Sequence, residues 1–289
     1  MSRLLVLILR LLHALLPARA LGWLGEGLGV ALYRLARGRR RIGQINLSLC
    51  FPELDERQRR ALLRAHFRAL GRATLQETVS WWGSRAEVER LTRIEGIKHL
   101  TPHLGKPMIW LVPHFVGLNI GGVRITAEFG TVVTMYARIK NPVLDKLMLH
   151  ARTRFGGSEL YSRQDGIKPV IRAIRGGRPF YYLPDLDHGL KDGIFAPFFG
   201  VPAATITGLS RIARATGAVV VPIIIRQQDG GYVARFYPAW EDFPSNDVEA
   251  DTRRMNAFIE DRVRELPAQY FWLHKRFKTR PPGEAKLYG

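Results

Sequence analysis

Short apolar segments alternate with segments of helical periodicity through the body of this chain, and this alternation limits the folds open to it. Residues 107–112 are a continuous apolar run, and residues 218–225 are a second one rich in β-branched side chains. Runs of this length and kind are typical of buried strands. Residues 56–82 instead carry apolar side chains at helical spacing. Strands that alternate with helices predict an α/β domain with a largely parallel or mixed sheet.

The same criteria assign the remaining segments: strands at residues 131–136, 179–183 and 232–237, and helices at residues 142–154, 167–175, 205–216 and 248–266. Thr205 has a side chain suited to an N-cap, and Gly176 and Gly177 suit the end of the helix before them. We find no internal repeat and no low-complexity linker. The sequence therefore predicts one domain over residues 42–289, preceded by an N-terminal segment over residues 1–41.

The N-terminal segment has the composition of a membrane anchor. Residues 4–16 are almost wholly apolar except for Arg10 and His13, and a mixed stretch over 21–35 leads into an arginine cluster at 34–41. A spanning helix needs about 20 apolar residues, so the sequence leaves open whether the segment spans the bilayer or lies in its interface. The alternative is an ordinary helix packed on the domain. We expect attachment to an anionic membrane surface, with the arginines on the cytoplasmic side.

The charge balance limits the classes of partner that the chain is expected to bind. Lys and Arg number 44 against 25 Asp and Glu, which gives a formal net charge of +19. Such a field attracts nucleic acid, anionic lipid, phosphorylated substrates or an acidic carrier protein. We find no zinc-finger spacing, RNP-like motif or basic region with heptads, which argues against nucleic acid. The single cysteine, Cys50, excludes a disulfide framework and a Cys-rich zinc site, and it fits a reducing, cytosol-facing compartment.

His114 follows the apolar run at 107–112, at the start of a stretch that reads as a turn and then a helix. Ligand sites of open α/β sheets form at the carboxyl ends of strands, and a histidine there can act as a general base. Residues 114 and 119 can meet only if His114 lies on the turn and Asn119 in the first turn of the helix. Taken alone, His114 is better explained as a polar residue at a strand end.

Several motifs that follow one another in a fixed order are stronger evidence of family than His114 alone. The chain resembles the late lipid A acyltransferases, the lauroyl and myristoyl group, and residues 111–122 resemble the His-x4-Asp/Glu box of the wider glycerolipid and lipid A acyltransferases. The other matching stretches are Asn-Leu-Ser-Leu-Cys-Phe-Pro-Glu at 46–53 and those at 136–142, 152–156, 183–189, 195–200 and 204–208. The stretch at 269–281, Gln-Tyr-Phe-Trp-Leu-His-Lys-Arg-Phe-Lys-Thr-Arg-Pro, is the most specific.

The resemblance implies a glycerol-phosphate-acyltransferase-like fold, a mixed sheet flanked by helices. It also implies transfer of a fatty acyl group from acyl carrier protein to a hydroxyl of a lipid A precursor, in lipopolysaccharide biosynthesis at the cytoplasmic face of the inner membrane. No metal and no bound cofactor are expected. The rival interpretations are an acyltransferase of the same superfamily that acts on another membrane lipid, and a non-catalytic lipid-binding homologue.

The resemblance assigns His114 as the base and residue 119 as the acid that orients it, and here the chain departs from the pattern with Asn119. The equivalent Asp-to-Asn change in a serine protease triad lowers turnover about 10⁴-fold. The chain is therefore an inactivated variant, a natural homologue with little activity, or an enzyme in which Asp185 or Asp187 compensates. The first two are favoured, because Asn for Asp is the smallest change that removes the charge. On that basis Asn119→Asp should raise activity.

Arginines and two further carboxylates complete the predicted site. Candidates for contacts with acceptor phosphates or with an acidic carrier are Arg138, Arg152, Arg154 and Arg163. Taken singly, each arginine is better explained by a surface ion pair or a solvated face than by a ligand contact. Asp185 and Asp187 are expected to orient site arginines or substrate, since two carboxylates one residue apart are weak grounds for a metal site.

Overall fold

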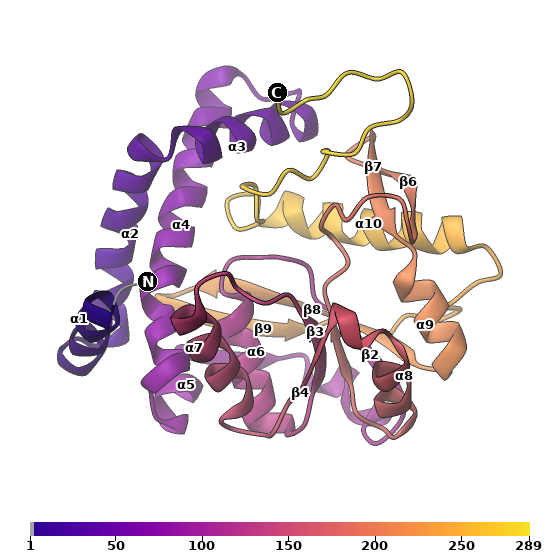
Figure 1. The fold of residues 1–289 in the computed structure, drawn as a ribbon, viewed down its shortest axis with the longest axis horizontal. Coiled ribbons are helices and arrows are strands. Elements are labelled where there is room, and N and C mark those ends of the chain that lie inside the picture. The colour runs from indigo at the N-terminus through magenta and orange to yellow at the C-terminus, as the bar shows by residue number, and fades with distance from the viewer. Residues whose placement is uncertain (1–2) are drawn as a thin grey trace.

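A seven-stranded sheet forms the centre of the computed structural model, which describes residues 3–289 apart from the side chain of Arg163 (Figure 1). The strand order is β1-β9-β8-β2-β5-β3-β4. The strands of this sheet are β1 (Thr92–Glu95), β2 (Met108–Leu111), β3 (Val133–Tyr136), β4 (Glu159–Ser162), β5 (Phe180–Tyr182), β8 (Val219–Gln228) and β9 (Gly231–Phe236). All neighbours pair in parallel except β8 and β9, which are antiparallel. This mixed sheet confirms the predicted α/β class.

Helices cover both faces of the sheet. They are α1 (Arg3–Leu15), α2 (Ala18–Leu35), α3 (Arg37–Cys50), α4 (Glu56–Trp82), α5 (Arg85–Leu91), α6 (Leu118–Phe129), α7 (Pro142–Thr153), α8 (Lys168–Arg175), α9 (Gly208–Thr216) and α10 (Val248–Glu265). Successive side chains of a strand point to opposite faces. Ile109 and Leu111 of β2 accordingly pack with residues of α8, α9 and α10, whereas Met108 and Trp110 pack with residues of α5, α6 and α7.

Helix α4 ends at Trp82 and begins at Glu56, as the spacing of its apolar residues predicted. A capping box fixes its start, because Asp55 and Gln58 each accept a hydrogen bond from the other's backbone N–H. Helix α2 lies along α4 (Figure 1). A Cβ atom at Gly71 would collide with the carbonyl oxygen of Gly25, and one at Gly29 with that of Phe67. Glycine is therefore required for the two backbones to approach this closely.

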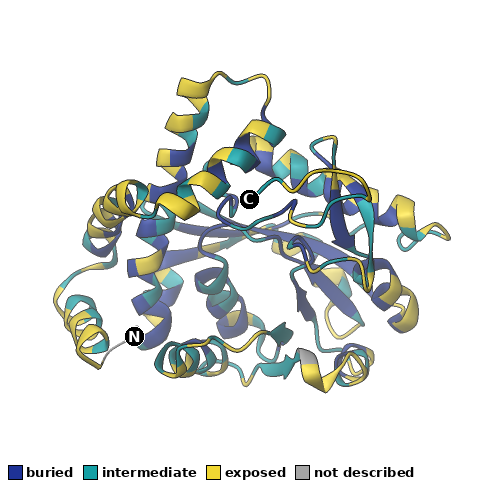
Figure 2. Cartoon of the chain, turned by 45° about the horizontal axis from the view of Figure 1, so that its top comes forward, coloured by how far each residue is buried: buried dark blue, intermediate teal, exposed yellow. Residues whose placement is uncertain are grey.

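Helices α1 and α2 are largely exposed; exposed residues are coloured yellow in Figure 2. No residue of α1 is buried, and α2 buries only Leu21 and three glycines. Helix α3 runs from Arg37 to Cys50, through the predicted boundary between residues 41 and 42. Within residues 3–289, no helix combines the length and the apolar character needed to cross a bilayer.

The predicted helix at 205–216 begins later than expected. Residues Val201–Ile206 form β7, which pairs with β6 (Gly193–Phe198) in an antiparallel hairpin. Thr205 therefore lies in a strand, and the N-cap is Thr207, whose hydroxyl instead donates to Asp192 O. The strands β1 and β4, on the two edges of the main sheet, were also not predicted from the sequence.

The segment after α10 returns across the carboxyl end of β2. Phe115 and Tyr270 form a β-bridge, and the Phe271 N–H donates to His114 O at 2.9 Å. Asn46 of α3 holds the same segment, since its Nδ2 donates to the carbonyl oxygens of Trp272 and His274 at 2.7 Å each. The C-terminal segment thereby fixes the backbone around His114.

Candidate active site

His114 lies on the turn between β2 and α6, the arrangement that the sequence required. Gly117 precedes α6 with φ of 86°, in the left-handed region that favours glycine. A Cβ atom there would also overlap the ring of Tyr232. The turn places Asn119 in the first turn of α6, and both His114 and Asn119 line the same cavity.

The imidazole of His114 is paired with Asp185. The two atoms His114 Nδ1 and Asp185 Oδ1 are 2.7 Å apart, and the backbone N–H of His114 donates to Asp185 Oδ2 at 2.9 Å. The carboxylate is 1% exposed and the imidazole 20% exposed. Burial alone raises the pKa of Asp185, but the attraction of His114 and these two hydrogen bonds outweigh it, so the pKa is lowered. Asp185 is therefore an ionised orienting partner whose position leaves Nε2 of His114 as the free ring nitrogen.

Asn119 has a different partner from the one expected. Its Oδ1 accepts a hydrogen bond from Arg152 Nη2 at 2.7 Å. The pairing inferred from the spacing of residues 114 and 119 is corrected accordingly: the carboxylate that orients His114 comes from the loop after β5. Spacing along one segment could not reveal this, because Asp185 is 71 residues away and reaches His114 only through the pairing of β2 with β5.

A cavity of about 1000 Å³ opens beside His114. Its volume is at the upper end of the range for small-molecule sites. Its walls come from the strands β3, β4, β5 and β7, from the helices α6 to α9 and from the loops beside them. The lining is mainly apolar. Its polar side chains include His114, Asn119 and Arg152, and also Asp145, His188, Asp192 and Arg211. This combination suits a ligand with a long apolar part and one reactive polar group.

The family model for bacterial lipid A biosynthesis acyltransferases matches residues 2–279. The chain belongs to this family. It is 35% identical to the lipid A biosynthesis lauroyltransferase of Escherichia coli, over 94% of this chain and 90% of that one. It is 34% identical to the lipid A biosynthesis myristoyltransferase of the same organism, over 88% of this chain and 80% of that one. The 1-acyl-sn-glycerophosphate acyltransferase structure from Thermotoga maritima aligns with a TM-score of 0.40 and 13% identity, over 81% of this chain and 98% of that one.

In this member of the lipid A acyltransferase family, the other predicted site residues lie in different surroundings. Arg152 lines the cavity. Arg154 instead donates to the backbone carbonyls of Ser80, at 3.0 Å, and Gly83, and so joins the end of α7 to the end of α4. Arg138 is exposed beyond the end of β3. Arg163 belongs to a short 3-10 helix, and its side chain lies outside the described part of the chain.

Asp187 organises the C-terminal segment. Its carboxylate accepts hydrogen bonds from the Thr279 N–H at 2.6 Å, the Thr279 hydroxyl at 2.8 Å and the Gly189 N–H at 2.9 Å. Its own N–H donates to Nε2 of His274 at 3.1 Å. The pKa of His274 is lowered to about 4, by burial first and then by the charges of His114 and Arg276. These contacts indicate a structural role for Asp187, which lies on the same loop as Asp185 and two residues after it.

Glu77 of α4 is a residue that the sequence analysis missed. Its Oε1 is buried and has no hydrogen-bond partner among the described residues. Burial raises its pKa to about 8, against the attraction of Arg152. Glu77 follows Leu70 and Ala73 at helical spacing, so an acid on the apolar stripe of the predicted helix was a signal that could have identified it.

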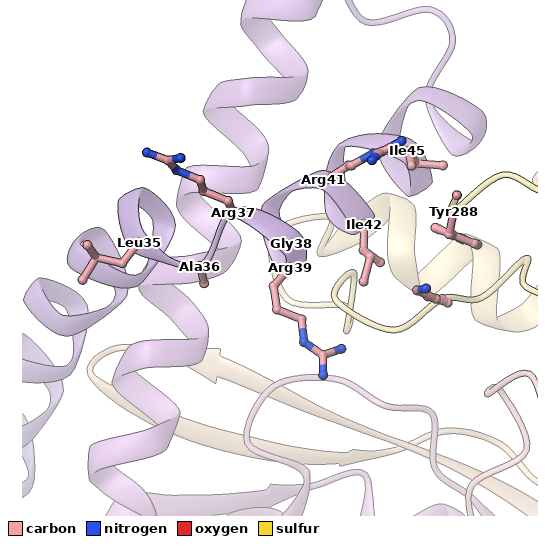
Figure 3. A pocket seen from close by; sticks show the side chains of 11 residues that line it. Leu35, Ala36, Arg37, Gly38, Arg39, Arg41, Ile42, Ile45 and Tyr288 are labelled. Carbon is pink, nitrogen blue, oxygen red and sulfur yellow. The ribbon is translucent and has the colours of Figure 1, made fainter.

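A second hollow, of about 660 Å³, lies at the corner between α2 and α3. Its lining combines the apolar Leu35 and Ile42 with Arg37, Arg39 and Lys275. Figure 3 shows the side chains of Arg37 and Arg39 extending in different directions. The cationic side chains that line the hollow therefore do not converge on one point.

Proposed function

We propose that this chain transfers a fatty acyl group from acyl carrier protein to a hydroxyl of a lipid A precursor, in lipopolysaccharide biosynthesis. The observation that carries the proposal is the His114–Asp185 pair, with His114 lining a largely apolar cavity, in a member of this family. The names of its relatives, a lauroyltransferase and a myristoyltransferase of lipid A biosynthesis, support this substrate class.

The proposed reaction exchanges a thioester for an ester. Nε2 of His114 removes the proton from the acceptor hydroxyl as its oxygen attacks the thioester carbonyl carbon. The tetrahedral intermediate collapses with cleavage of the C–S bond, and the imidazolium returns the proton to the leaving sulfur. Asp185 holds the Nδ1–H and stabilises the imidazolium, the role of the aspartate in a serine protease triad.

In this proposal two groups stabilise the oxyanion of that intermediate. The first turn of α6 lies beside His114, and the N–H groups at a helix N-terminus carry partial positive charge. The guanidinium of Arg152 is held at the same place by Asn119. Preorganised donors in a cavity shielded from water supply much of the rate enhancement in acyl transfer.

In this proposal Asn119 does not disable the enzyme. The sequence alone favoured an inactivated or weakly active chain, because it left His114 without a charged partner. The 2.7 Å contact with Asp185 supports the third explanation, compensation by another acid. Asn119 then acts on Arg152, whose guanidinium it orients without neutralising.

We further propose that the N-terminal helices attach the chain to the cytoplasmic face of the inner membrane. Exposed apolar side chains lie along both helices: Leu4, Leu7, Leu11 and Leu15 on α1, and Trp23, Leu24, Leu28 and Leu35 on α2. The arginines at 37–41 follow at the end of α2. An apolar helical face bordered by arginines is suited to an anionic bilayer surface. The high net positive charge also suits an acidic acyl carrier protein.

The test is acyl transfer by the purified chain from lauroyl carrier protein to a Kdo-bearing lipid A precursor. We expect turnover by the parent chain and loss of it in His114→Ala. Transfer only to a phospholipid acceptor would assign the chain to another membrane lipid. Binding of lipid with no transfer to any acceptor would leave the non-catalytic interpretation. Sedimentation with anionic vesicles, compared with a Leu7→Asp and Leu11→Asp double variant, tests the membrane face separately.

A further inference from the structure

Gly122 is a glycine in the interior of α6 that backbone packing does not require. Its φ is not in the left-handed region, and a Cβ atom there would meet only the Tyr181 hydroxyl and ring at 3.5 and 3.6 Å, which is ordinary van der Waals contact. Its neighbour Gly121 differs, because a Cβ atom at that position would overlap Ile225. Glycine inside a helix lowers stability relative to alanine. The packing of the protein explains Gly121 but gives no reason for Gly122.

The cavity supplies the reason, because Gly122 is part of its wall. Asn119 and Gly122 are three residues apart and Thr126 follows four residues later, so all three lie along one side of α6. All three also line the cavity. From Asn119 to Thr126 this side of the helix is about 10 Å long, at 1.5 Å per residue. We call this part of the cavity the α6 arm, lined by Gly122, Thr126, Val132, Met148 and Ser158.

The α6 arm is closed at the end away from His114. Thr126, Val132 and Met148 are buried, and Thr126 Oγ1 and Ser158 Oγ are 3.4 Å apart across that end. The Thr126 hydroxyl donates to Gly122 O and the Tyr181 hydroxyl to Leu118 O, so these polar groups are satisfied within the protein. The surface that these residues present to the α6 arm is therefore mainly carbon. The opposite part of the cavity reaches the exposed residues Ile167 and Ala215, where a bulky substrate can enter.

We propose that Gly122 is a specificity-determining residue: its missing side chain keeps the α6 arm open for the acyl chain that is transferred, and the closed end limits the length of that chain. The proposal rests on the proposed acyl transfer. The thioester carbonyl must lie at His114, so a chain that continues from it along α6 passes over the Cα of Gly122. The acceptor and the carrier protein then approach from the open side.

The experiment compares Gly122→Ala and Gly122→Leu with the parent chain. Lipid A precursor is acylated in competition by decanoyl, lauroyl, myristoyl and palmitoyl carrier protein, and thermal unfolding is measured for each variant. Gly27→Ala is the matched control, since Gly27 is also in a helix interior and has open space around its Cα. Both alanine variants should raise the unfolding temperature by a few degrees. Only the variants at Gly122 should shift the donor preference toward shorter chains, by about fourfold for each methylene excluded.

An unchanged donor profile in Gly122→Leu would overturn the proposal, and so would an equal loss with all four donors. The combination of higher stability with a shorter preferred chain is not expected of a residue that only supports the fold. If the parent chain transfers no acyl group to any acceptor, the proposed function fails. The α6 arm is then tested by displacement of a fluorescent fatty acid with the same four chain lengths as free acids. A shift to shorter acids in Gly122→Leu supports the proposal, and no shift overturns it.

Discussion

Replacement of Asp185 by Asn tests whether the carboxylate of Asp185 allows His114 to act as a base. Both carboxylate oxygens of Asp185 contact His114, one at the imidazole and one at the backbone N–H. Asn can replace only one of these two acceptor oxygens, because its amide nitrogen is a donor, and it carries no charge to stabilise the imidazolium. The same change at the aspartate of a serine protease triad lowers turnover about 10⁴-fold. Because Asp185 is fully buried, little solvent screening weakens its effect. We expect a fall of 10³-fold to 10⁴-fold in kcat, equivalent to about 4–5.5 kcal/mol.

Asn119→Asp provides the matched comparison, because it adds at one position of the site the charge that Asp185→Asn removes at another. Asn119 contacts Arg152 and not His114, so its replacement exchanges a neutral acceptor for a charged one in a single hydrogen bond. We therefore expect Asn119→Asp to change kcat by no more than about tenfold, which corresponds to about 1.4 kcal/mol. The gain expected from sequence alone, which assumed that residue 119 orients His114, is therefore not expected from the structure.

The assay is initial-rate acyl transfer from lauroyl carrier protein for the parent, the two single variants and His114→Ala. Thermal unfolding of each variant shows whether it is folded. The reasoning is refuted if Asp185→Asn keeps more than about a tenth of parental kcat while Asn119→Asp raises kcat more than about a hundredfold. That result would assign the orienting role to position 119.

Three further predictions concern stability and reactivity. The pKa of Asp185 is lowered on folding, so its ionised form stabilises the protein at neutral pH and this contribution is lost as the pH falls through the folded value. The difference in unfolding free energy between the parent and Asp185→Asn should thus shrink below about pH 4, as measured by urea titration. Gly71→Val should cost about 3 kcal/mol or more by the same method, because α2 cannot then approach α4 at Gly25. Cys50 is buried, which raises the pKa of its thiol, so a disulfide reagent should modify it rapidly only in denaturant.

The sequence by itself determined much of this protein. Local periodicity predicted α4 and β2 because each depends on which residues of a single segment are buried. The ordered motifs predicted the family, which the match over residues 2–279 confirms. The position of His114 on a turn after a strand also follows from local patterns. The edge strands β1 and β4 were missed because they are four residues long and only partly buried, which leaves a weak apolar signal.

Only the tertiary structure decided which side chains of the site meet. Asp185 reaches His114 because β5 pairs with β2, and Arg152 reaches Asn119 because α7 packs on α6. Such contacts depend on strand order and helix packing, which leave no trace in the spacing of residues along one segment. The same holds for Gly121 and Gly122, two adjacent glycines that the sequence alone cannot tell apart. One is required by Ile225 of the neighbouring strand and the other faces a cavity, and only the surroundings of each Cα distinguish them.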